Sequence, residues 1–174
     1  AILWGANLYQ ANLKYASLSN ANLYGTVLAY SSLGNADLSY ADITNSDLYS
    51  AILIDANLQG ANLSFSSLAL VDLFEANLTD ATLYNTYFGN AYLIGADFTN
   101  AMCVGAFFVG SSLYETVFDG ANLEWSYFDE NQDSYEDASF YAGYVTGAES
   151  GDLNLDGEGN ILDIVELVNQ ILNP

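Results

Sequence analysis

A strict period of five residues constrains the fold of this chain more than any other feature. Every fifth residue from Leu3 to Phe128 is large or apolar, and a small residue stands two places before each one. The 26 large places hold 19 Leu, five Phe, one Ile and one Cys, while the small places hold 17 Ala, five Ser, three Thr and one Val. Neither a helix nor a strand has a period of five, so we expect a repeat architecture.

The successive units AILWG, ANLYQ and ANLKY show the pattern that the next residues repeat without a slip through residue 130. This pattern resembles the pentapeptide-repeat family, whose consensus is A(D/N)LXX. The resemblance implies an all-β fold, a right-handed quadrilateral parallel β-helix. In such a solenoid four pentapeptides make one coil of 20 residues, and the small and large residues point to a narrow axis.

Simple packing arguments favour the same fold. A period of five precesses around the 3.6-residue turn of an α-helix and leaves no apolar stripe. Two inward residues in every five give a core too thin for two large side chains, so one must be small. With coils stacked at ~4.8 Å, 26 units form a rod of roughly 30 Å. Residues 20 apart should then stack on one side, and two Phe stacks should face each other across the axis: Phe88, Phe108 and Phe128 against Phe98 and Phe118.

The composition limits the partners of the chain. It carries a net charge of −21, no histidine and a single basic residue, Lys14, which argues against binding nucleic acid or an anionic membrane. No apolar run approaches the ~18 residues of a membrane span. The single cysteine, Cys103, occupies an inward place, so we expect a buried thiol. No signal peptide or initiator Met is visible, which suggests a mature form or an excised piece.

The pentapeptide domain is predicted to cover residues 1–150. Its regular phase spans 1–130, an inserted segment follows at 131–137, and weak final repeats occupy 138–150. Asp129, Asn131 and Asp133 have the spacing of calcium ligands. A calcium loop would next need Gly and later an acid, where this chain has Ser134 and Phe140. We therefore favour a solvated loop over a degenerate ion site.

Residues 151–174 differ in kind from the repeats and predict a calcium loop followed by a helix. Oxygen-bearing side chains stand at alternate places, a glycine stands where the loop must turn sharply, and Glu158 is placed to offer its backbone carbonyl. One Ca²⁺ is the expected cofactor. The predicted ligands are Asp152, Asn154, Asp156, Glu158, Asn160 and Asp163.

Asp rather than Glu at the twelfth place of this loop is similar to dockerin repeats. Dockerins are calcium modules of secreted bacterial proteins that bind a cohesin partner, so the resemblance implies a secreted, extracellular protein. A dockerin has two such repeats and this chain shows one, which leaves a cohesin-like partner as one alternative. The other alternative is that the helix caps the open end of the solenoid. Its apolar stripe is Ile161, Ile164, Val165, Val168, Ile171 and Leu172.

Outward residues spaced 20 apart form apolar columns on the predicted rod. Exposed apolar columns are typical of a partner surface, for another protein or for a second copy of this chain. Cover by the C-terminal tail, or stacking on sugar rings, are the alternatives. The candidates are Ile54, Phe74, Ile94 and Tyr114 in one column, and Tyr87, Phe107 and Tyr127 in another with Trp125 nearby.

The acidic surface suggests a second class of function. Residues 1–130 hold 13 acids and one Lys, and the rod's charge density is comparable to that of DNA, with one charge per ~1.7 Å. Some family members imitate DNA and bind DNA gyrase. Here the acids are spread over all four sides without paired rows, so a solvating acidic coat is the simpler interpretation.

Catalysis is not expected. Histidine is absent, the one thiol is predicted to be buried, and an uninterrupted solenoid offers little concavity. The leading hypothesis is therefore a non-catalytic, extracellular, acidic rod that acts as a spacer or interaction surface, with a calcium-stabilised tail that caps or attaches it. A gyrase-binding DNA mimic is the alternative.

Overall fold

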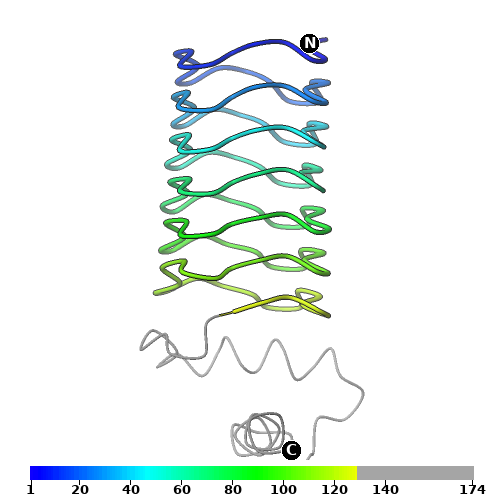
Figure 1. Ribbon diagram of the computed structural model, residues 1–174, viewed down its shortest axis with the longest axis vertical. Helices are drawn as coiled ribbons and strands as arrows, with labels where there is room; N and C mark the ends of the chain where they lie inside the picture. Colours follow the sequence, from blue (N-terminus) through cyan, green and yellow to red (C-terminus); the bar gives the residue numbers. More distant parts are fainter. Residues whose placement is uncertain (129–174) are drawn as a thin grey trace, which may run out of the picture.

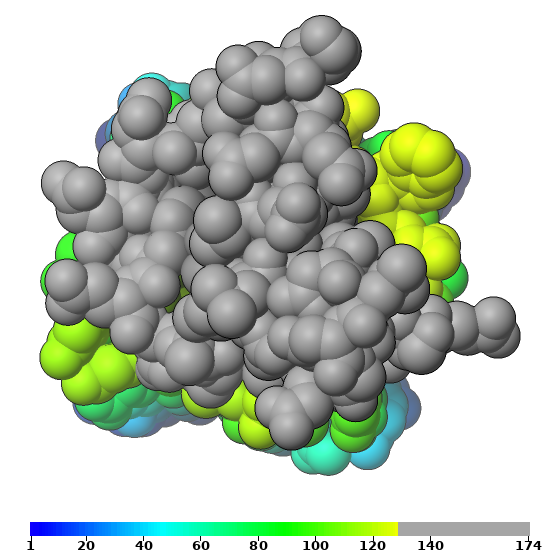
Figure 2. Space-filling view, turned by 90° about the horizontal axis from the view of Figure 1, so that it is seen from below, coloured from blue at the N-terminus to red at the C-terminus, as the bar shows by residue number. Residues whose placement is uncertain are grey.

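Residues 1–128 form a straight rod of stacked four-sided coils in the computed structural model, which describes these residues (Figure 1). Viewed along the rod, coils from different parts of the sequence lie one behind another at the corners (Figure 2). The predicted loop at 131–137, the weak repeats at 138–150 and the calcium loop and helix at 151–174 lie outside the described residues.

Each pentapeptide makes one side of a coil, and we number the sides in chain order. The first side begins with Ala1, the second with Ala6, the third with Ala11 and the fourth with Ala16, and each returns every 20 residues. We call the five positions of a unit its first to fifth place; the small inward residue holds the first place and the large inward residue the third.

Parallel pairing between coils replaces long strands. The second place of each unit pairs in parallel with the residue 20 positions later, in 22 bridges from Ile2–Asn22 to Phe107–Tyr127. The hydrogen bonds run along the rod axis. The Leu23 N–H donates to the Asp42 carbonyl of the next coil at 2.7 Å, and the Asn22 N–H donates to the Ala1 carbonyl of the previous coil at 2.9 Å. An inner coil is thereby tied to both of its neighbours.

A tight turn forms each corner. At nearly every corner the N–H of the new unit donates back to the third-place carbonyl of the unit before, as Ala6 does to Leu3 at 2.9 Å. The Ser46 N–H donates instead to the Ser66 hydroxyl at 3.0 Å. The fifth place of all 25 described turns has a positive φ, in seven glycines and 18 other residues. This left-handed conformation is unfavourable for residues with a Cβ, so the inter-coil bonds must hold it in place.

The Asn or Asp of the second place stabilises the turn that follows it. Its side-chain oxygen accepts the backbone N–H of the fourth place, as Asp72 does from Phe74 at 3.1 Å. Short polar side chains favour such Asx turns, which gives a physical reason for Asn and Asp at this place. The other residues that do this are Asn7, Asn12, Asn22, Asp37, Asp42, Asp47, Asn57, Asn62, Asn77, Asp97 and Asn122.

The core is the column of first-place and third-place residues along the axis, and its predicted Phe stacks are confirmed. Phe88 and Phe108 stack with ring centroids 5.0 Å apart, and Phe98 and Phe118 stack at 4.9 Å. The two stacks meet edge to face across the axis, with Phe98 and Phe108 5.9 Å apart. Cys103 is buried as predicted, and burial raises the pKa of its thiol.

Hydroxyl groups in the first place are satisfied inside the core. The Ser66 hydroxyl donates to the Ile43 carbonyl at 2.7 Å, and the Ser111 hydroxyl donates to the Phe88 carbonyl at 2.6 Å. Both acceptors lie 23 residues earlier, on the preceding coil. Ser and Thr therefore replace Ala here without leaving a buried polar group unmatched.

Candidate interaction surface

The third side carries an apolar surface over its four lower coils. Its fourth places form the predicted column of Ile54, Phe74, Ile94 and Tyr114, and we call this column the apolar row. Tyr114 is 60% exposed, while the other three members are half-buried. Phe74 packs against the ring of Tyr92 in the next coil, a contact that a column read from the sequence does not convey.

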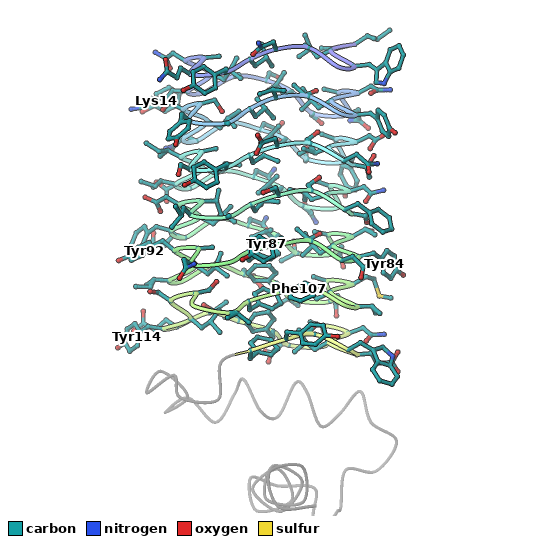
Figure 3. The ribbon with its side chains drawn as sticks, viewed as in Figure 1. Lys14, Tyr84, Tyr87, Tyr92, Phe107 and Tyr114 are labelled. Carbon is teal, nitrogen blue, oxygen red and sulfur yellow. The ribbon has the colours of Figure 1, made fainter. Side chains whose placement is uncertain are left out.

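Two residues that the sequence analysis missed widen this surface. Ile52 and Tyr92 occupy second places of the same side and are 42% and 44% exposed. The rings of Tyr92 and Phe74 stack with their centroids 6.4 Å apart. Figure 3 shows Tyr92 and Tyr114 on the same side of the rod as Lys14. The sequence could have identified both residues, because each is an apolar or aromatic residue two places before a member of the predicted column.

A row of carboxylates borders the apolar row. Asp55, Glu75 and Glu115 are exposed and occupy fifth places of the third side, and Gly95 stands between the last two; we call these three acids the acidic row. A Cβ built on Gly95 would lie 3.2 Å from the Glu75 Cγ, so the Glu75 side chain lies over this glycine. The third side thus presents parallel lines of apolar and acidic side chains.

The second side holds the other predicted aromatic column. Tyr87 and Phe107 lie with ring centroids 6.0 Å apart, and Phe107 and Tyr127 stack at 4.4 Å with an interplanar angle of 12°. Tyr87 also lies across Gly89, whose position has no room for a Cβ. Because the Phe107 ring lies between these two tyrosines, stacking of a sugar on Phe107 is disfavoured. Figure 3 shows Tyr87 and Phe107 away from Tyr92 and Tyr114.

Trp125 does not belong to either column. It stands at a fifth place of the first side, with φ of 59° and 79% exposure, at the corner where the chain passes to the second side. Trp125 is near Tyr127 in sequence, but the structure places it on the corner beside the second side and not in the column of Tyr127. It therefore extends the exposed aromatic surface around that edge.

The fourth side is mainly polar over its described length, although Tyr40 exposes an aromatic ring there. The Asn57 amide donates to Asp37 at 3.3 Å, and the Asn77 amide donates to Asn57 at 3.3 Å. At the corner the Asn100 amide donates to Asp80 at 3.4 Å. This ladder of amides and carboxylates satisfies its own polar groups between coils.

Five of the 11 acids in the described residues act as turn acceptors. They are Asp37, Asp42, Asp47, Asp72 and Asp97. Their place in each turn is shared with asparagines, so a local structural role accounts for them. Only the acidic row forms a line of three carboxylates on one side within residues 1–128.

No group of three or more potential metal ligands lies together within residues 1–128. The predicted calcium ligands at 152–163 fall outside this range. The same described coils contain no helix with the length and apolarity needed to cross a membrane.

The comparison with family models decides which family this architecture represents. The model described as pentapeptide repeats matches in eight copies, over residues 1–29, 16–53, 51–90 and 91–129. The chain belongs to the pentapeptide repeat family. Together the matches cover most of its 174 residues, and the last match ends at residue 129, one residue beyond the described coils.

Solved pentapeptide repeat proteins share the fold. HetL, involved in heterocyst differentiation regulation in the cyanobacterium Nostoc sp. strain PCC 7120, is 25% identical with a TM-score of 0.58, over 72% of this chain and 71% of HetL. A pentapeptide repeat protein from the Arabidopsis thaliana thylakoid lumen is 29% identical with a TM-score of 0.56, over 57% of this chain and 69% of its own. These likenesses identify the rod as a right-handed quadrilateral β-helix. The comparison with curated proteins gave no match.

Proposed function

We propose that this pentapeptide repeat protein is a non-catalytic interaction rod that binds another protein through its second and third sides. The observation that supports this most is the exposed apolar surface of the third side, where Ile52, Tyr92 and Tyr114 add to the half-buried row. Contiguous apolar surface on a soluble chain is typical of a binding site. The inter-coil hydrogen bonds hold it rigid, which lowers the entropy lost on binding.

The rest of the sequence is consistent with binding rather than catalysis. The chain has no histidine and only one Lys, so the commonest general bases and amine nucleophiles are scarce. The inward places hold packing residues, and the Asn and Asp residues of the second places act as turn acceptors. The residues left to carry function are therefore the other outward ones, which include Ile52 and Tyr92.

Affinity capture from the source organism tests this proposal. The bait is the full chain, compared with a third-side variant, Phe74→Ser with Ile94→Ser, and a fourth-side control, Gln59→Ser with Thr79→Ser. We expect a partner that the wild type and the control retain and the third-side variant loses, and that rebinds as a purified protein. Equal capture by all three folded baits would contradict a role for the third side.

The second part of the proposal concerns the tail. We propose that residues 152–163 bind one Ca²⁺ and that this tail caps or attaches the rod in an extracellular setting. The support is the ligand pattern of Asp152, Asn154, Asp156 and the residues that follow. Calcium titration calorimetry on wild type and Asp152→Ala tests it. A saturable site in the wild type that the variant loses is expected, and heat signals identical in both would refute it.

The DNA-imitating alternative has weaker support. DNA presents two lines of phosphates, while the described coils offer one line of three carboxylates and several acids engaged in turns. Binding of purified DNA gyrase at low salt, with loss of binding as salt rises, would favour the alternative. We expect no such binding.

A further inference from the structure

The apolar row and the acidic row run in the same direction, parallel to the rod axis. Successive coils are ~4.8 Å apart. Every coil from Ile54 to Tyr114 supplies a member of the apolar row, whereas the acidic row skips one coil at Gly95. The apolar row from Ile54 to Tyr114 covers three coil steps, or about 14 Å. The two rows occupy adjacent places of each unit, so an occupant of the third side meets both together.

This spacing suits one secondary structure better than another. An α-helix advances about 5.4 Å per turn, so three turns laid along the rod span about 16 Å. Alternate residues of an extended strand are about 6.7 Å apart, so three such steps span about 20 Å. A helix therefore stays nearly in step with the coils, one turn for each coil, whereas a strand loses register.

The charge of the third side selects among helices. Asp55, Glu75 and Glu115 line one edge of the apolar row, and Asp72 stands beside it. Complementary charge steers encounter and fixes orientation at interfaces. A second copy of this chain is a poor occupant, because it would bring another net charge of −21 against the same acids.

We propose that the third side binds an amphipathic α-helix of a partner protein, aligned with the rod axis. Its apolar stripe packs on the apolar row, and Lys or Arg residues on one flank face the acidic row. This inference rests on the proposed function, since it names the chemistry of the partner for the same surface. The Tyr92 ring, stacked on Phe74, borders the helix-binding surface on the edge opposite the acidic row.

A designed peptide provides the probe. It has 18 residues of Ala, Leu and Lys, blocked at both ends and fluorescently labelled, with Leu along one stripe and Lys along one flank. A matched peptide carries Glu in place of Lys. Fluorescence anisotropy measures binding of each to the full chain at physiological salt. We expect saturable binding of the Lys peptide and at least about tenfold weaker binding of the Glu peptide.

Two triple variants with the same change in net charge distinguish specific binding at the third side from non-specific electrostatic attraction to the acidic rod. The third-side triple is Asp55→Asn, Glu75→Gln and Glu115→Gln, and the fourth-side control is Asp80→Asn, Asp97→Asn and Asp119→Asn. We expect the first to weaken the Lys peptide at least about tenfold and the second less than about twofold. Phe74→Ser with Ile94→Ser should weaken it as much as the first, and circular dichroism verifies that each variant is folded.

Equal weakening by both triples would overturn the inference, because it would show attraction to the whole acidic rod. Absence of saturable binding of the Lys peptide to the wild type at low salt would overturn it as well. This holds even if the cause were that the tail occupies the third side. These failures are distinguishable from failure of the proposed function. A native partner that depends on the third side but does not compete with the peptide would leave the interaction rod standing and refute the helix.

Discussion

The third and fourth sides of the rod share one scaffold and differ almost entirely in what they show to solvent. Both bury a Leu in the third place, as Leu73 and Leu78 do. Outside, the third side stacks Phe74 on Tyr92, while the fourth side links Asn57 to Asn77 by an amide hydrogen bond. The difference shows that two of five places fix the fold, which leaves the others open to carry a surface chemistry.

The largest expected effect should be the same on both sides. Leu73→Ala and Leu78→Ala each remove a fully buried side chain, and each should lower the free energy of unfolding by about 2–5 kcal/mol. Urea unfolding followed by circular dichroism measures both. A difference of more than about 1 kcal/mol between the two losses would contradict the view that the two sides pack equivalently into one core.

Corner glycines test the turns of the two sides. Gly95 has a φ of +70° and Gly60 a φ of +63°, and an added Cβ would meet Glu75 and Tyr40 respectively. We expect Gly95→Ala and Gly60→Ala each to lower stability by about 1–2 kcal/mol. Gly95→Asn is the matched control, because Asn tolerates a positive φ. Asn85 and Asn100 already have a positive φ at the fifth place of their turns. An Asn variant as unstable as the Ala variant would point to crowding instead of backbone strain.

The second-place acceptors should distinguish the sides modestly. Asp72 on the third side accepts one turn N–H, whereas Asn57 on the fourth side accepts from Gln59 and Asn77 and donates to Asp37. Asp72→Ala should cost about 1 kcal/mol, and Asn57→Ala somewhat more. Asp72→Asn should retain stability, since asparagine fills this place in other turns. Comparable loss in Asp72→Asn would contradict the acceptor role.

The smallest effect is a pH dependence on the fourth side. The side chain and backbone N–H of Ser39, then the Asn57 amide, hold the pKa of Asp37 below its ordinary value. A carboxyl whose pKa is lower in the folded state adds stability above its unfolded pKa, and this is lost as pH falls through the folded pKa. Asp37→Asn should therefore make stability slightly less acid-sensitive. An unchanged pH profile of the melting temperature would show that the bonds to Asp37 contribute little.

The fold was predictable because the inward places repeat without error. Leu3 to Phe128 set the period, and the 20-residue coil follows once four units close, so even the Phe98 and Phe108 contact could be anticipated. The surface was predictable only in part. The column of Ile54 to Tyr114 was found, but the exposure of its members depends on neighbours one coil away, which a column read from sequence does not convey.

Two features of the site required the structure. The pairing of Tyr92 with Phe74 depends on how side chains lean between adjacent places of different coils. Likewise, a solvating coat was expected from the acids, yet Asp72 and Asp97 accept backbone N–H groups of their own turns. The hypotheses for Asp152 to Asp163 and for the helix that follows remain predictions, because these residues lie outside the described coils.

The closure of four units into one coil imposes different rules of insertion and deletion on the interior and on the surface. Removing one unit, such as residues 81–85, keeps every small and large residue in phase, so the core is unchanged in kind. The same deletion turns all later coils by a quarter of a revolution, which moves Ile94 and Tyr114 from the third side to the second and separates them from Phe74. The interior thus tolerates length changes in steps of five, whereas the aligned surface survives only steps of 20.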